Sequence, residues 1–162
     1  MAAAILLLLS SVATAEIIDR VLAVVSGDLI MLSDIEAARE FKLVDVAGAA
    51  DPVEAALSQL IDRALILDEV ERYAPPEPGV DQIDRAFAGV RAVFPSVEAF
   101  ATALARVGSD EARLRATLRQ NLRLQAYLDQ RFAADTPERG RAMTDEWVAG
   151  LRRRAEIVRY ER

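Results

Sequence analysis

Strand-forming sequence lies near the two ends of the chain, and this placement limits the folds that the chain can adopt. Residues Ile17 to Val25 are mostly β-branched or apolar, Ser26-Gly27-Asp28 favours a turn, and Leu29 to Leu32 suits a short return strand. At the other end, Ala155 to Tyr160 alternates between two side-chain faces. A two-stranded hairpin alone is marginally stable in water. We therefore expect the C-terminal segment to join the hairpin in a small antiparallel sheet.

The sequence between these strands is typical of helices with marked starts. Ser33 is followed three residues later by Glu36, which is a capping-box pattern. Asp51 stands directly before a proline, as an N-cap does before the first helical residue. Ser96 and Ser109 are the N-caps that we expect for two later helices.

The expected helix ends are marked by proline and glycine. Residues 74–79 contain three prolines, which cannot continue a helix, and Gly108 suits a helix C-terminus. A polar connector from Ala133 to Gly140 precedes the last helix. After the helix that begins at Ser33, we expect helices over about 52–73, 80–94, 97–107, 110–132 and 141–154.

These elements predict a mainly α fold in one domain, with a small antiparallel sheet. With 52% hydrophobic residues, the chain can bury a substantial core. We expect residues 16–162 to form a single module. Within it, residues 16–132 hold the hairpin and most helices, and residues 141–162 return as the C-terminal helix and strand.

Charge is unevenly distributed along the chain. Residues 16–90 hold 16 acidic and 6 basic side chains, and residues 91–162 hold 10 acidic and 14 basic side chains. The simpler interpretation is that the two parts present complementary faces to each other, and the alternative is a basic binding surface. The formal net charge of -6 argues against nucleic acid as a partner.

Cysteine and histidine are both absent, which limits the possible chemistry. Disulfides, thiol nucleophiles, Ser-His pairs and zinc sites of the usual kind need one or both of them. Glu36, Asp68 and Glu71 fit ordinary solvated helix faces better than an active site. We therefore expect no enzyme activity, no catalytic residues, no metal and no cofactor.

The N-terminal fifteen residues resemble a signal peptide. Ala2 to Val12 is an apolar run of suitable length, and Ala13-Thr14-Ala15 has small residues where signal peptidase cleaves. The run lacks the usual preceding Lys or Arg, so we expect the true start to lie upstream. We expect the signal peptide to direct export to the periplasm and to be cleaved after Ala15. The apolar run is too short to span a bilayer, so we expect no stable membrane insertion.

Several stretches resemble the SurA family of periplasmic chaperones for outer-membrane proteins. The N-terminal hairpin and first helix of that family are similar to IDRVLAVVSGDLIMLSDIEAA. Its later helices are similar, in order, to ALSQLIDRALILDEVERY, VDQIDRAFAGV and RLRATLRQNLRLQAYLDQRF, and its C-terminal helix and strand to DEWVAGLRRRAEIVRY. The resemblance extends over essentially all of residues 16–162.

The resemblance implies an ATP-independent chaperone, or holdase, that binds unfolded outer-membrane protein segments. Members of this family usually carry one or two parvulin-type prolyl isomerase domains before the C-terminal element. Here only residues 133–140 occupy that place, and parvulin sites depend on histidines that this chain lacks. We therefore expect no prolyl isomerase activity.

A holdase needs apolar side chains that a client can reach. The candidates for substrate binding are Phe87, Phe94 and Phe100, which flank the breaks around the third and fourth helices, and Tyr127 on the long helix. The alternative for each is ordinary core packing, because aromatic residues at helical spacing usually serve the core. The alternative function is an exported structural or adaptor protein that uses the same fold to form a homodimer or bind one folded partner.

Overall fold

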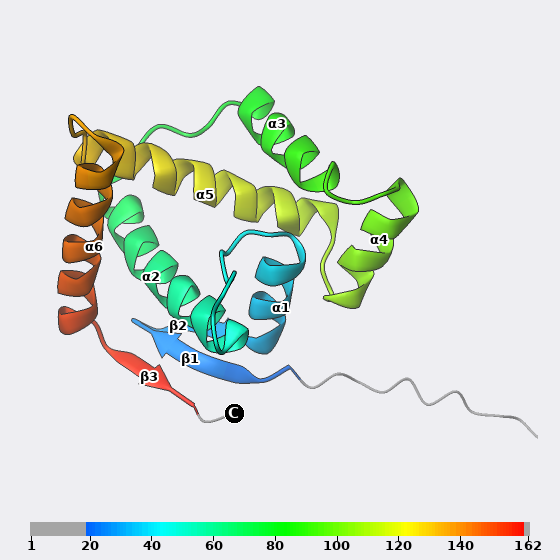
Figure 1. Cartoon of the computed structure of the whole chain (residues 1–162), viewed down its shortest axis with the longest axis horizontal. Helices are drawn as coiled ribbons and strands as arrows, with labels where there is room; N and C mark the ends of the chain where they lie inside the picture. The colour runs from blue at the N-terminus through cyan, green and yellow to red at the C-terminus, as the bar shows by residue number, and fades with distance from the viewer. Residues whose placement is uncertain (1–18, 161–162) are drawn as a thin grey trace, which may run out of the picture.

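The computed structural model describes residues 19–160. The predicted signal peptide and its cleavage site after Ala15 lie outside the described residues. In the described part the protein is mainly helical with one small sheet, as the sequence predicts (Figure 1).

The sheet is formed by the two ends of the described chain. Strands β1 (Val21–Val25) and β2 (Asp28–Met31) form the N-terminal hairpin, and β3 (Ile157–Arg159) comes from the C-terminal segment. The order is β2-β1-β3 and both pairings are antiparallel, so β1 is the central strand. The predicted pairing of the C-terminal segment with the hairpin is confirmed.

Six helices occupy the described residues between β2 and β3: α1 (Leu32–Glu40), α2 (Pro52–Tyr73), α3 (Val80–Arg91), α4 (Val97–Arg106), α5 (Glu111–Arg131) and α6 (Pro137–Arg154). Figure 1 shows α5 running across the molecule, from α6 at one end to α4 at the other. The sheet lies along one side of α2.

Two of the predicted N-caps are confirmed. The Asp51 carboxylate accepts hydrogen bonds from the backbone N–H groups of Val53 and Glu54, each at 3.0 Å. The Ser96 hydroxyl accepts one from Ala99 N–H at 3.1 Å. Each cap satisfies backbone donors that have no partner inside the helix.

The prediction of a capping box between Ser33 and Glu36 is wrong, because α1 begins before Ser33. The N-cap is Met31, and its N–H donates to the carboxylate of Asp34 at 2.8 Å. The Ser33 hydroxyl instead donates to Asp19, which precedes β1. The helix thus starts directly from the end of β2, leaving no residues for a separate cap.

Ser109 is also not an N-cap, since Asp110 takes that position and accepts from Arg113 N–H at 2.7 Å. Gly108 has a φ of 60°, and Ser109 N–H donates back to Leu104 O at 2.9 Å. Ser109 therefore completes the end of α4 rather than the start of α5.

The helix boundaries differ from the sequence prediction at two more places. Helix α3 ends at Arg91, before the predicted end at Phe94. Helix α6 begins at Pro137, inside the segment predicted as a connector, with the Thr136 hydroxyl accepting from Arg139 N–H. The Thr136-Pro137 pair is a cap followed by proline at the first helical position, which explains the earlier start.

The core consists of two hydrophobic clusters. The first lies between the sheet, α2, α6 and the C-terminal half of α5, and Leu22, Ile35 and Val70 are fully buried in it. The second joins the end of α1, α3, α4 and the N-terminal half of α5 around Phe100. Helix α5 contributes to both, so it holds the α3–α4 part against the rest of the molecule.

Ion pairs link the acidic and basic parts of the chain. Basic residues after position 90 pair with acidic residues before it in Arg106–Glu40, Arg115–Asp84, Arg119–Glu77, Arg123–Glu71, Arg152–Asp62 and Arg159–Glu54. This pattern supports the interpretation of the charge asymmetry as two complementary faces.

Candidate functional site

A cleft of about 430 Å³ opens between α1, α2, α5 and the start of β2. Its walls draw on both hydrophobic clusters: Ile30 and Leu60 belong to the first, and Phe41 and Leu114 to the second. This cleft, which we call the α1–α2–α5 cleft, therefore lies where the two clusters meet. Its volume is within the usual range of ligand pockets.

The lining of the α1–α2–α5 cleft is mixed, with ten apolar and eight polar or charged residues. Its apolar residues are Leu29, Ile30, Ala37, Ala38, Phe41, Leu43, Leu60, Ala64, Leu67 and Leu114. Its charged residues are Asp28, Asp34, Arg63 and Arg113. Apolar lining residues with polar groups between them suit an extended apolar segment whose orientation is set by those polar groups.

Arg63 is the most withdrawn charge of this cleft. Its Nε donates to Asn121 Oδ1 at 2.7 Å and its Nη2 to Gln120 Oε1 at 2.9 Å, so the side chain bridges α2 to α5. Burial lowers the pKa of Arg63 from its ordinary value, and the nearby charge of Asp34 acts in the opposite direction. The guanidinium stays charged, because arginine is not deprotonated in proteins.

Three of the four aromatic residues predicted to bind substrate lie together, in the second cluster. The rings of Phe87 and Phe100 are 5.6 Å apart between centroids, and those of Phe94 and Phe100 are 5.4 Å apart. Phe41 joins them at 6.1 Å from Phe94. Phe87 is 6% exposed and Phe100 is 1% exposed, so both pack in the core, as the alternative interpretation has it. Phe94 is half-buried and remains reachable from solvent.

Tyr127, the fourth predicted residue, is 6% exposed and lies in the first cluster. Its ring stacks on Tyr73 at 5.8 Å and contacts Trp147 at 6.0 Å. Burial raises the pKa of the Tyr127 hydroxyl, so it is un-ionised at neutral pH. Tyr73 is 58% exposed and covers Tyr127, which makes Tyr127 a core residue under an aromatic surface.

The residues of the α1–α2–α5 cleft were missed in the sequence, although a signal for one of them exists. Leu60, Arg63, Ala64 and Leu67 follow the i, i+3, i+4, i+7 spacing of one helix face. A cation in an otherwise apolar stripe of α2 indicates a charge held inside the fold. The other walls come from α1, α5 and β2, whose meeting depends on tertiary packing.

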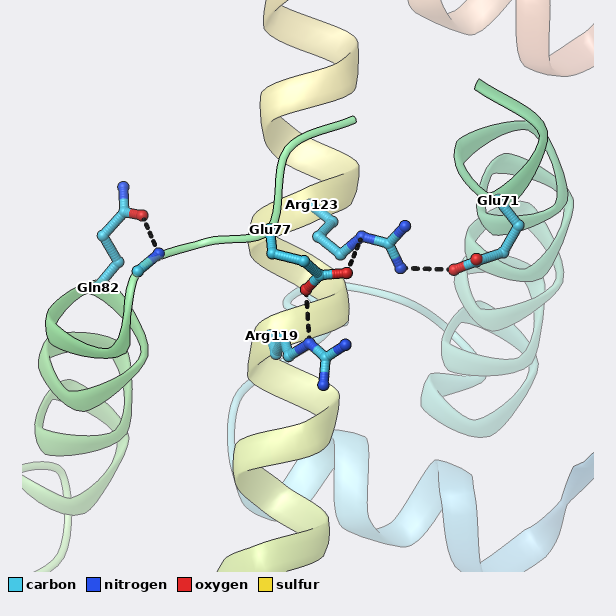
Figure 2. A network of polar contacts seen from close by, with 6 residues as sticks. Glu71, Glu77, Gln82, Arg119 and Arg123 are labelled. Carbon is cyan, nitrogen blue, oxygen red and sulfur yellow. Dashed lines mark hydrogen bonds and ion pairs between the residues drawn. The ribbon is translucent and has the colours of Figure 1, made fainter. Parts of the chain in front are cut away.

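A second group of polar contacts anchors the proline-rich connector, residues 74–79, to α5 (Figure 2). Arg119 Nε donates to Glu77 at 2.7 Å, and Arg123 lies 3.3 Å from the other oxygen of the same carboxylate. Arg123 also donates to Glu71 on α2 at 2.6 Å. Figure 2 shows Glu77 between the two arginines of α5, with Glu71 reaching Arg123 from the other side. These contacts therefore fix the path of the connector from α2 to α3.

The carboxylates considered as an active site do not converge. Glu71 pairs with Arg123, Asp68 lies three residues before it on α2, and Glu36 lies on α1. Among residues 19–160, no group of His, Cys, Asp and Glu side chains is arranged to hold a metal ion. No helix in the same part of the chain is long and apolar enough to cross a membrane.

No protein-family model matches the chain, and no curated protein matches it.

Proposed function

We propose that the protein is an ATP-independent periplasmic chaperone, similar to the SurA family, that holds unfolded outer-membrane protein segments. We also propose that it lacks prolyl isomerase activity. The α1–α2–α5 cleft takes the place of the predicted aromatic residues as the principal client site, because three of those four residues are buried.

The observation that carries the proposal is the open cleft at the junction of the two clusters, whose lining holds ten apolar residues. A holdase needs apolar contact area that is kept available on a folded scaffold. The sheet that joins both ends of the described chain supplies the scaffold, and α5 carries one wall of the cleft. The sequence resemblance and the expected signal peptide support the periplasmic assignment.

Suppression of aggregation tests the proposal. An unfolded outer-membrane β-barrel protein is diluted from denaturant, and light scattering is followed with and without the purified protein. We expect a modest molar excess to suppress scattering without ATP. Full aggregation at every ratio would defeat the holdase proposal.

The export and isomerase parts of the proposal need their own measurements. We expect fractionated cells to contain the protein in the periplasm with Glu16 as its first residue. We expect no catalysis of cis–trans isomerisation of a proline-containing peptide. Retention in the cytoplasm, or measurable isomerase activity, would contradict these parts separately.

A second function, self-association through the sheet, is favoured by one specific observation. Val24 is paired with Leu29 on one side and Val158 on the other, so the three side chains share one face. Leu29 is 58% exposed and Val158 is 42% exposed. Such an apolar row suits a structural protein that dimerises or binds one folded partner, and light scattering at several protein concentrations tests it. A mass that doubles with concentration supports this function, and a constant monomer mass rejects it.

A further inference from the structure

The withdrawn arginines of this protein differ in how their charge is balanced. Arg123, 8% exposed, pairs with Glu71 and Glu77, and partly buried Arg152 pairs with Asp62. Arg63 is also partly buried, yet within residues 19–160 it forms no ion pair, and its two hydrogen bonds go to neutral amides. A charge withdrawn from water with no carboxylate in direct contact is costly. Asp34 acts on Arg63 only from beyond ion-pair distance, so Arg63 has an electrostatic reason to receive an anion.

The hydrogen-bonding groups around Arg63 are suited to an oxyanion. A guanidinium has five N–H donors, and Asn121 and Gln120 accept from two of them. Because those amides use their oxygens to accept, their NH₂ groups remain as donors, and neither donates to a described residue. Both amide side chains line the cleft. Arg63, Asn121 and Gln120 therefore present donors to the cleft.

Neither acidic residue of the cleft forms an ion pair with Arg63. Asp34 acts on Arg63 through its charge from beyond ion-pair distance, and one of its carboxylate oxygens accepts from Met31 N–H at the start of α1. Asp28 lies in β2, on another wall of the cleft. Arg113 adds a second positive charge to the lining.

We propose that the α1–α2–α5 cleft binds the C-terminal end of an apolar polypeptide segment, with the terminal carboxylate on Arg63. The preceding side chains lie against the apolar walls. This inference rests on the proposed chaperone function and narrows it to one class of client segment. A carboxylate that accepts from a guanidinium and two amides forms charge-assisted hydrogen bonds, which are among the strongest in proteins.

A chain end fits this cleft better than an internal acidic residue. Arg63 bridges α2 to α5 through its hydrogen bonds, so the two helices are joined at its guanidinium. A segment that passed through would need an exit between these helices, whereas a terminus needs none. The limited volume of about 430 Å³ also suits the last few residues of a chain rather than a long segment.

Three labelled peptides test the inference by fluorescence anisotropy with the purified mature protein. All carry an N-terminal fluorophore on one short sequence of leucine, phenylalanine and serine, in which the third peptide has glutamate in place of one internal serine. The first ends in a free carboxylate, the second in a carboxamide, and the third has an internal glutamate and a carboxamide end. We expect the free-acid peptide to bind about tenfold or more tightly than the other two.

Variants assign the effect to Arg63. We expect Arg63→Gln to weaken binding of the free-acid peptide about tenfold and to leave the carboxamide peptide unchanged. Arg85→Gln is the matched control, since Arg85 is exposed on α3 and does not line the cleft, and it should leave both affinities unchanged. Circular dichroism checks that each variant is folded. Should Arg63→Gln fail to fold, the comparison of the three peptides on the wild-type protein still decides whether the protein recognises a C-terminal carboxylate.

The outcomes separate this inference from the proposed function. Equal affinity for the free-acid and carboxamide peptides, or no binding of either, overturns carboxylate recognition. Equal affinity for the free-acid and internal-glutamate peptides overturns the assignment to a chain end. In each case, continued suppression of aggregation leaves the chaperone proposal in place. Preferential binding of the free acid without any suppression of aggregation retains this site and rejects the chaperone function.

Discussion

At the scale of single residues, the surroundings decide what each arginine contributes. Arg123 is buried against α2 and the connector and pairs with two carboxylates that remain largely in water. Arg119, one turn earlier on α5, is 53% exposed and pairs with Glu77 alone. Arg123 thus packs its stem within the fold, whereas Arg119 adds mainly a surface ion pair.

The first prediction compares these two arginines. We expect Arg123→Ala to lower the free energy of unfolding by about 1–2 kcal/mol, because it removes buried contacts of the stem and two ion pairs. We expect Arg119→Ala to lower it by less than about 0.5 kcal/mol. Urea unfolding at neutral pH measures both changes. Equal losses would show that the burial of Arg123 has no energetic importance.

The second prediction concerns the phenylalanines of the second cluster. We expect Phe100→Ala to lower the free energy of unfolding by about 3–5 kcal/mol, since a fully buried ring leaves a cavity. We expect Phe94→Ala to lower the free energy of unfolding clearly less, because Phe94 is half-buried and water already reaches part of its ring. Denaturant unfolding provides the test. A Phe100→Ala variant as stable as wild type, but defective in binding clients, would restore Phe100 as a substrate-binding residue.

At the scale of elements, the proline-rich connector is held by a titratable contact. The hydrogen bond from Arg119 holds the pKa of Glu77 below its ordinary value of 4.5. A lowered carboxyl pKa in the folded state stabilises the protein above the unfolded pKa. That contribution disappears as the pH falls through the folded pKa, when Glu77 becomes protonated.

The third prediction follows from the lowered pKa of Glu77 in the folded state. We expect Glu77→Gln to be less stable than wild type at pH 7 and equal to it once the pH is well below 4.5. Thermal unfolding across this pH range measures the difference. Asp81→Gln, at an exposed acid in the first turn of α3, is the control for loss of one negative charge. A stability difference for Glu77→Gln that stays constant from pH 7 to pH 3 would contradict the proposed role of Glu77.

The fourth prediction concerns β3. Deletion of residues 155–162 removes the β1–β3 pairing, including the bond from Tyr160 N–H to Leu22 O at 3.0 Å. At about 1 kcal/mol for each lost backbone hydrogen bond, we expect a loss of roughly 3 kcal/mol. In a domain of this size that lowers Tm by roughly 10 °C. An unchanged Tm would mean that the sheet does not depend on its third strand.

Local sequence signals placed most elements correctly, and their errors have local causes. The hairpin, the C-terminal strand and the caps Asp51 and Ser96 depend on residues close in sequence, which the sequence displays directly. Ser33 and Ser109 look like caps by the same rules, yet Ser33 lies inside α1, whose N-cap is Met31, and Asp110 caps α5 while Ser109 completes the end of α4. When two residues compete for one cap, tertiary placement decides between them.

At the scale of the whole molecule, the candidate site could not be read from the sequence alone. The predicted binding residues flank the breaks around the third and fourth helices, but the way α3, α4 and α5 pack turns Phe87 and Phe100 inward. The cleft combines β2, α1, α2 and α5, whose residues are far apart in sequence. Sequence periodicity shows that one face of α2 is apolar. It does not show which neighbouring elements cover that face and which part of it stays open as the cleft.

The central claim is that clients bind in the α1–α2–α5 cleft, and filling it tests this most directly. Ala37 lines the cleft and is partly exposed, so Ala37→Trp should occupy its space. Ala142→Trp makes the same change at an exposed position of α6 away from the cleft. Both variants are checked by circular dichroism and then compared with wild type in suppressing aggregation of an unfolded outer-membrane protein. We predict that Ala37→Trp loses most of the suppression while Ala142→Trp keeps it; full suppression by a folded Ala37→Trp variant would contradict the account.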